Sequence, residues 1–148
     1  MTQGNVAYVD TSALAKYYVV EDYSVEVKGY LSGLDRILLS DLTITEMRCL
    51  LARRKRMKLL GEGLDMVIYN TLLNHIEQGF FTVLGFENRH FKEAANLISM
   101  LPNCTLRTLD ALHLAVATDY GLNRIATADN GIAEAAGVLG LEVDGFGF

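Results

Sequence analysis

The sequence predicts an α/β fold, a three-layer α/β/α sandwich in which helices cover both faces of a short, mainly parallel sheet. Short apolar runs alternate with segments of helical periodicity along the whole chain. The apolar runs contain few polar residues, as strands buried on both faces require. With 148 residues, 51% of them hydrophobic and 21% charged, the chain suits one compact core, and we expect residues 1–148 to form a single domain.

The first half of the chain reads as two strand–helix units and an extra helix. NVAYV, residues 5–9, fits a buried strand, and DTSALAKYYV, residues 10–19, begins a helix directly after it. ILLS, residues 37–40, fits a second strand, and a helix follows over residues 44–59 until a glycine ends it. Residues 63–79 carry apolar side chains at a spacing of four, which also predicts a helix.

The second half continues the alternation of strands and helices. The predicted strands are apolar runs, at residues 80–86, 124–128 and 141–143. The predicted helices show amphipathic or apolar periodicity, at residues 91–100, 106–117 and 132–140. The only proline, Pro102, lies in the turn between two of these helices. Strands that alternate with helices in this way predict parallel pairing.

Composition excludes several classes of protein. The net charge of −5 argues against a general nucleic-acid binder, although residues 53–58 (RRKRMK) hold five of the thirteen basic residues. No secretory pattern and no uncharged apolar run of about 18 residues is present, so we expect a cytoplasmic protein without a membrane span. Cys49 and Cys104 form no close pair, and we interpret both as free thiols.

Four acidic residues occupy positions at which α/β folds place ligands. Asp10 and Asp129 come directly after predicted strands, and Glu46 and Asp110 lie in the first turns of predicted helices. In parallel sheets the ligand crevice lies at the carboxyl edge of the strands, where these acids can meet. Converging carboxylates repel one another, and a divalent cation removes that repulsion. Oxygen ligands without a His/Cys cluster favour Mg²⁺ or Mn²⁺ over zinc.

Each acid also has a local explanation. Asp10 is a candidate N-cap, Glu46 completes a T-x-x-E capping box, and Asp129 stands in the turn sequence ADNG. Asp110 suits the positive end of a helix that Thr108 would cap. If all four acids only cap helices, the protein is a non-catalytic α/β binding module.

Other charged residues divide into bystanders and candidates for RNA contact. Asp119 lies nine residues beyond Asp110, on the opposite side of the same helix, and is excluded from the site. Asp41 also follows a strand and is a weaker candidate. The basic residues near one helix end predict contact with an RNA backbone, a docking surface for an acidic partner or a solvated helix end; they include Arg48, Arg53 and Arg54.

Four motifs together resemble a known family. YVDTSALAKYY, TITEMRCLLARR, LRTLDALHLAVA and IATADNGIAEAAGVLGLEV occur in the order seen in PIN-domain ribonucleases, and are most similar to those of the VapC-like toxins of type II toxin–antitoxin pairs. The resemblance covers essentially the whole chain and implies a PIN-like fold. It implies a metal-dependent endoribonuclease that leaves 5′-phosphate and 3′-hydroxyl ends. A PIN nuclease of RNA processing that is not a toxin is the alternative within the family.

Carried over by position, the resemblance assigns roles and partners. It implies Mg²⁺ or Mn²⁺ as cofactor and a catalytic metal site at Asp10, Glu46, Asp110 and Asp129. It implies supporting hydroxyl groups at Ser12 and Thr127. The implied partners are an RNA substrate, a small antitoxin protein that blocks the site, and a second copy of the chain in a homodimer.

Overall fold

The α/β class and the parallel sheet are confirmed by the computed structural model, which describes residues 4–148. The sheet has five strands in the order β3-β2-β1-β4-β5, and each of its four pairings is parallel. The strands are β1 (Val6–Val9), β2 (Arg36–Ser40), β3 (Thr82–Leu84), β4 (Arg124–Thr127) and β5 (Glu142–Gly145). The three central strands are mostly buried, which explains their near-continuous apolar sequences.

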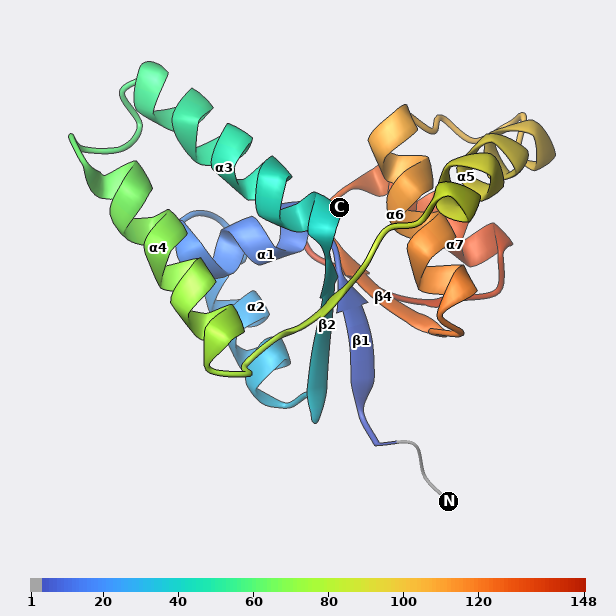
Figure 1. The fold of residues 1–148 in the computed structure, drawn as a ribbon, viewed down its shortest axis with the longest axis horizontal. Coiled ribbons are helices and arrows are strands. Elements are labelled where there is room, and N and C mark those ends of the chain that lie inside the picture. The colour runs from blue at the N-terminus through green and yellow to red at the C-terminus, as the bar shows by residue number, and fades with distance from the viewer. Residues whose placement is uncertain (1–3) are drawn as a thin grey trace.

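Helices cover both faces of this sheet (Figure 1). One face carries α1 (Thr11–Tyr18), α2 (Ser24–Ser32), α3 (Asp41–Arg56) and α4 (Leu64–Glu77), and the other carries α5 (Asn88–Met100), α6 (Thr108–Asp119) and α7 (Asn130–Val138). Successive side chains of β1 pack against opposite helical layers. Val9 packs with Leu14 and Met47, whereas Tyr8 packs on the α6 side. Each fully buried aliphatic side chain contributes about 1.5–3 kcal/mol to this core.

The structure adds one helix to those predicted and shifts the bounds of several other elements. Helix α2 was not predicted, because its sequence SVEVKGYLS holds a glycine and only Val27 and Leu31 as fully buried apolar residues. Helix α3 begins at Asp41, three residues earlier than predicted. The predicted strand over residues 80–86 is reduced to the three residues of β3, which lies at the edge of the sheet.

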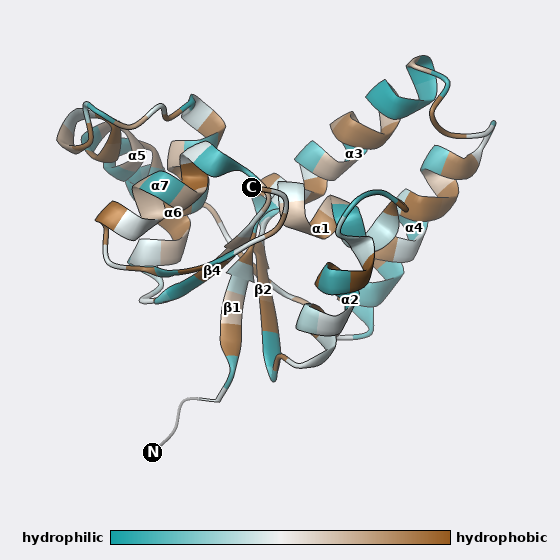
Figure 2. Ribbon diagram, turned by 180° about the vertical axis from the view of Figure 1, so that it is seen from behind, coloured by the Kyte–Doolittle hydropathy of each residue, from teal (hydrophilic) through white to brown (hydrophobic). Residues whose placement is uncertain are grey.

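Helices α3 and α4 run out from the sheet as a pair that we call the α3–α4 arm, residues 41–77 (Figure 1). The outermost turns of α3 are hydrophilic, where the basic run 53–58 lies (Figure 2). Within the arm, Arg48 Nη2 donates to Asp65 Oδ2 at 3.0 Å. None of the helices between residues 4 and 148 is both long and apolar enough to cross a membrane.

Candidate active site at the carboxyl edge of the sheet

The four predicted acids line one cleft of about 500 Å³. Asp10 follows β1 directly, and Asp129 lies two residues after β4. Glu46 enters from the second turn of α3, and Asp110 from the first turn of α6. The cleft therefore lies where the carboxyl ends of neighbouring parallel strands meet the starts of the covering helices, as expected for this class of fold.

Asp10 is the most buried of these acids, with 1% of its surface exposed. Its Oδ1 accepts hydrogen bonds from Ser12 Oγ at 2.7 Å and from the Ala13 amide at 3.0 Å. Its Oδ2 accepts a hydrogen bond from Thr127 Oγ1. Burial raises the pKa of Asp10, against the lowering effect of nearby His113 and of these hydrogen bonds. The carboxylate is thus fixed in place and desolvated.

Glu46 is held through one of its two carboxylate oxygens. Its Oε1 accepts hydrogen bonds from Thr11 Oγ1 at 2.7 Å and from His113 Nε2 at 2.5 Å. Burial alone would raise the pKa of Glu46, but the hydrogen bond and charge of His113 outweigh it and lower the pKa. The other ring nitrogen of His113 lies 2.5 Å from the hydroxyl group of Tyr8.

Among the described residues, the side chains of Asp110 and Asp129 accept hydrogen bonds from backbone amides only. Asp110 Oδ2 accepts from the Arg107 amide at 3.1 Å, and Asp129 Oδ1 accepts from the Ile132 amide at 2.8 Å. Burial raises the pKa of Asp110, and the neighbouring negative charge of Asp129 raises it further. These two carboxylates therefore repel each other across the cleft.

Three of the four acids form no ion pair in the part of the chain that the structure describes. Between residues 4 and 148, Asp10, Asp110 and Asp129 form no ion pair with lysine or arginine, and only Glu46 contacts a histidine. Within the same range, no three His, Cys, Asp or Glu side chains stand close enough together to hold a metal ion without adjustment. The donor set nevertheless fits a hard divalent cation, since all four acids offer oxygen and Mg²⁺ commonly retains several waters between itself and its ligands.

The capping explanations hold for some acids and fail for others. Asp10 caps α1 and Asp129 caps α7, so capping coexists with exposure to the cleft at both positions. The T-x-x-E capping box is absent, because α3 begins at Asp41 and Glu46 bonds to other elements. Capping of α6 by Thr108 was also wrong, since this residue is the first of the helix and Arg107 precedes it.

The three candidate arginines are placed differently. Arg53 and Arg54 line the cleft, but Arg54 Nη1 donates to Glu21 Oε2 at 2.5 Å. Arg48 lies outside the cleft lining and is paired with Asp65. Arg53 is exposed and has no ion pair within residues 4–148.

Two further acids, the excluded Asp119 and the weaker candidate Asp41, lie outside the cleft lining. Asp119 binds Arg89 and His90 on the far side of α6, as its helical position predicted. Asp41 accepts a hydrogen bond from the Phe86 amide at 3.3 Å and does not contribute to the cleft.

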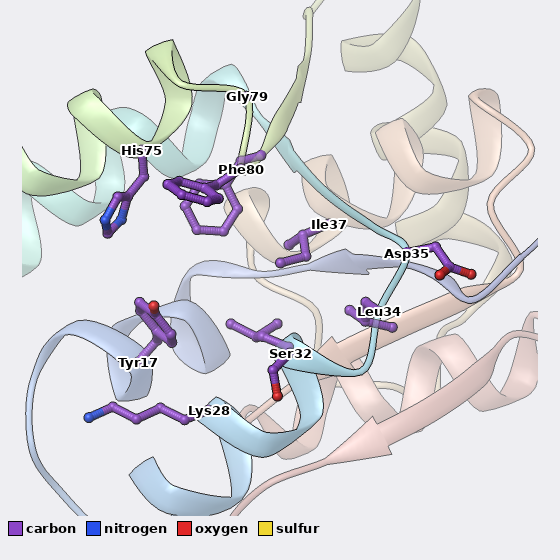
Figure 3. A pocket seen from close by; sticks show the side chains of 11 residues that line it. Tyr17, Lys28, Ser32, Leu34, Asp35, Ile37, His75, Gly79 and Phe80 are labelled. Atoms are coloured by element: carbon purple, nitrogen blue, oxygen red, sulfur yellow. The ribbon is translucent and has the colours of Figure 1, made fainter.

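A second cavity, of about 560 Å³, lies near the opposite end of β2 (Figure 3). Its lining is largely aromatic and aliphatic, with Tyr17, Ile37 and Phe80 around it. None of the four predicted acids contributes to this cavity. The acidic cleft is therefore the better candidate for metal-dependent chemistry.

A family model described as PIN domain matches residues 7–138, a span that contains all four acids of the cleft. The chain belongs to the PIN domain family. The resemblance was inferred from the four sequence motifs that carry these acids.

Relatives of this PIN domain are similar over nearly their whole length. The Mycobacterium tuberculosis protein named Ribonuclease VapC46 is 32% identical over 139 residues, which are 92% of this chain and 94% of the relative. The crystal structure of M. tuberculosis VapC20, described as a sarcin–ricin loop cleaving toxin, aligns with a TM-score of 0.68 and 19% identity over 88% of this chain and 94% of that chain. A VapBC-5 structure from M. tuberculosis, described as a toxin–antitoxin system, aligns with a TM-score of 0.62 and 17% identity over 96% and 98% of the two chains.

Sequence reasoning missed the side chains that hold Glu46. Thr11 lies in the D-T-S motif and His113 in the LRTLDALHLAVA motif, but neither was assigned to the site. The available signal was spacing: His113 follows Asp110 by three residues and so shares its face of the helix. The contact with Glu46 depends on how α3 packs beside α6, which spacing within one helix does not reveal.

Proposed function

We propose that this PIN domain is a metal-dependent endoribonuclease and the toxin of a toxin–antitoxin pair. The observation that carries the proposal is the cleft itself, in which four carboxylates gather and three lack a cationic partner within residues 4–148. Desolvated carboxylates without such a partner favour binding of an external cation. The relative named Ribonuclease VapC46 supports RNA as the substrate.

The cation is Mg²⁺ or Mn²⁺ in this proposal. Asp10, Asp110 and Asp129 would hold it, directly or through water, because their oxygens are bound by hydroxyl groups and backbone amides rather than by cations. When bound, such an ion activates water, neutralises phosphate charge and stabilises the departing oxygen. Glu46 and Asp110 are candidates for a second ion or for orienting the attacking water.

The chain's own residues orient these carboxylates. Ser12 and Thr127 each donate to a different oxygen of Asp10, so both supporting hydroxyl groups fix the plane of its carboxylate. Glu46 lines the cleft with its Oε1 occupied, which leaves its Oε2 available to accept a proton from water. Arg53 is suited to hold the RNA backbone, since it is exposed on the cleft wall without an ion pair in the described residues.

The partners follow from the relatives. VapBC-5 is described as a toxin–antitoxin system, and we propose that this chain likewise pairs with a small antitoxin protein that covers the acidic cleft. We further propose that it functions as a single domain, forms a homodimer and acts in the cytoplasm. A PIN nuclease of RNA processing would share the cleft and the chemistry but would not arrest growth when expressed alone.

Inducible expression with mapping of new RNA ends tests this function. Wild-type protein is expected to slow growth and to generate RNA fragments with 5′-phosphate ends, while Asp10→Asn does neither. Asp119→Asn is the matched control, because Asp119 lies on the same chain outside the cleft. New ends without growth arrest would favour the RNA-processing alternative, and the same ends from Asp10→Asn would overturn the assignment.

A further inference from the structure

A chain of buried hydrogen bonds leads from the sheet to Glu46. The hydroxyl group of Tyr8, in β1, lies 2.8 Å from Ser40 Oγ at the end of β2 and 2.5 Å from His113 Nδ1. His113 Nε2 then donates to Glu46 Oε1 at 2.5 Å, and Thr11 donates to the same oxygen. Tyr8, Ser40 and His113 are almost fully buried, so this chain is fixed on both sides by the core.

His113 is not positioned to bind the metal itself. Both of its ring nitrogens are already engaged, one by Tyr8 and one by Glu46. A carboxylate only accepts hydrogen bonds, so Nε2 carries a proton and has no lone pair for a metal. The imidazole therefore makes its direct contact with the four acids at Glu46 and is not itself a metal ligand.

We propose that His113 is a positioning residue that fixes Glu46 by one oxygen and leaves its other oxygen for water or metal in the cleft. A glutamate on a helix otherwise samples several rotamers, and holding one oxygen from two directions removes that freedom. This inference rests on the proposed nuclease function and deepens it. Partners of this kind, which orient a ligand without touching the metal, commonly change metal affinity or activity by about 10–100-fold.

Two substitutions separate the positioning role from simple packing. His113→Gln places an amide nitrogen near the position of Nε2 and retains a donor toward Glu46. His113→Asn is shorter, reaches only the position of Nδ1 and loses that donor. Both variants keep a polar group in the same buried site, so a difference between them reports the hydrogen bond to Glu46.

His90 provides a matched control in the same chain. It is also fully buried, its Nδ1 accepts from the Glu87 amide at 2.9 Å, and its Nε2 lies 2.7 Å from the carboxylate of Asp119. This histidine–carboxylate pair lies outside the acidic cleft. Replacement of His90 by asparagine therefore tests the loss of a buried histidine contact without any change to Glu46.

The experiment measures Mn²⁺ affinity by calorimetry, together with kcat and KM on one RNA oligonucleotide, for folded wild type and variants. His113→Asn is expected to lose about 10–100-fold in Mn²⁺ affinity or kcat with little change in KM. His113→Gln should recover most of this loss, and His90→Asn should lower Tm alone. Tyr8→Phe, which keeps the ring and removes only the hydroxyl group, is expected to give a smaller loss of the same kind.

Three outcomes would overturn the inference. One is wild-type Mn²⁺ affinity and kcat in His113→Asn, and another is an equal loss in His113→Gln and His113→Asn, which indicates packing alone. The third is an equal effect of His90→Asn on Mn²⁺ affinity. Failure of the nuclease function itself is distinguishable, because wild-type protein would then neither bind Mn²⁺ nor cleave RNA.

Discussion

Two buried aspartates of this PIN domain have opposite surroundings. Asp65, in the α3–α4 arm, is 2% exposed and is paired with Arg48, while Lys55 lies 4.0 Å away. Asp10, in the cleft, is 1% exposed and has only hydroxyl and amide donors. Burial raises the pKa of both carboxyls, but Arg48 and Lys55 reverse the effect at Asp65 and leave its pKa lowered.

The difference separates structural acids from acids available to a ligand. A buried carboxylate needs a partner of opposite charge, and Asp65 finds that partner within the fold. Asp10 does not, and neither do Asp110 and Asp129 within residues 4–148. Among the described residues, pairing within the chain therefore distinguishes the buried Asp65 from the buried Asp10. Exposed acids such as Asp41 also form no ion pair within residues 4–148, and what separates them from the candidate metal site is their place outside the cleft.

The largest expected effect is on catalysis by Asp10→Asn. The variant keeps the size of the side chain but removes the charge that would hold the ion, so turnover of RNA in Mg²⁺ should fall by at least about 100-fold. Its Tm without metal should be equal to that of wild type or higher, because a desolvated charge has been removed. Steady-state cleavage and thermal unfolding measure the two effects, and turnover close to wild type would remove Asp10 from the site.

Asp65→Asn should show the reverse pattern. The change leaves the partly buried guanidinium of Arg48 without its charged partner, and Arg48 Nη1 already lacks a hydrogen bond in the structure. We expect a lower Tm. RNA turnover per folded molecule should stay within about threefold of wild type, because the contact between Asp65 and Arg48 lies outside the acidic cleft. A large loss of turnover without loss of Tm would show that the distinction between the two aspartates is wrong.

Pairing also separates the two arginines of the cleft wall, and here the expected effect is a smaller one, on RNA binding. Arg53 is unpaired in residues 4–148, whereas Arg54 is bound to Glu21. Arg53→Gln should weaken RNA binding and reduce the slope of affinity against salt concentration by about 0.7–1, as expected for one lost phosphate contact. Binding titrations at several salt concentrations measure this, with Arg48→Gln as the control outside the cleft. An equal change in slope for both variants would contradict the assignment.

The smallest expected effect is on the pH dependence of folding stability, to which the two aspartates contribute with opposite signs. The raised pKa of Asp10 means that the folded chain binds this proton more tightly than the unfolded chain does, so the contribution of Asp10 to metal-free stability falls as pH rises above about 4. The lowered pKa of Asp65 contributes stability above about pH 4 that is lost as pH falls. Urea unfolding between pH 3 and 7 should therefore show Asp10→Asn and Asp65→Asn deviating from wild type in opposite directions.

Much of the fold and the position of the cleft could be predicted from the sequence. Apolar runs ending at Asp10 and near Asp129 define strand ends, and parallel pairing brings those ends to one edge. The positions of Glu46 and Asp110 near the starts of their helices made the same edge plausible, but their exact places depend on helix packing that the sequence does not reveal. These predictions depend on local periodicity and on the general geometry of α/β sheets.

The rest depends on contacts between distant segments. Helix α2 has weak amphipathic patterning and is stabilised by packing of Val27 and Leu31, so local sequence did not reveal it. The contact between His113 and Glu46 joins residues 67 positions apart. The pairing of Arg48 with Asp65, outside the cleft lining, likewise appears only when α3 and α4 are placed side by side.

Calorimetric titration of Mn²⁺ into the metal-free protein tests the central claim most directly, namely that unpaired acids in the cleft are kept for an external cation. Wild type and Asp65→Asn should bind Mn²⁺ with similar affinity, and saturation at 100 times the dissociation constant should stabilise both by about 2.7 kcal/mol. Asp10→Asn should show a dissociation constant raised by at least about tenfold. Equal Mn²⁺ binding by Asp10→Asn and wild type, or none by wild type, would contradict the account.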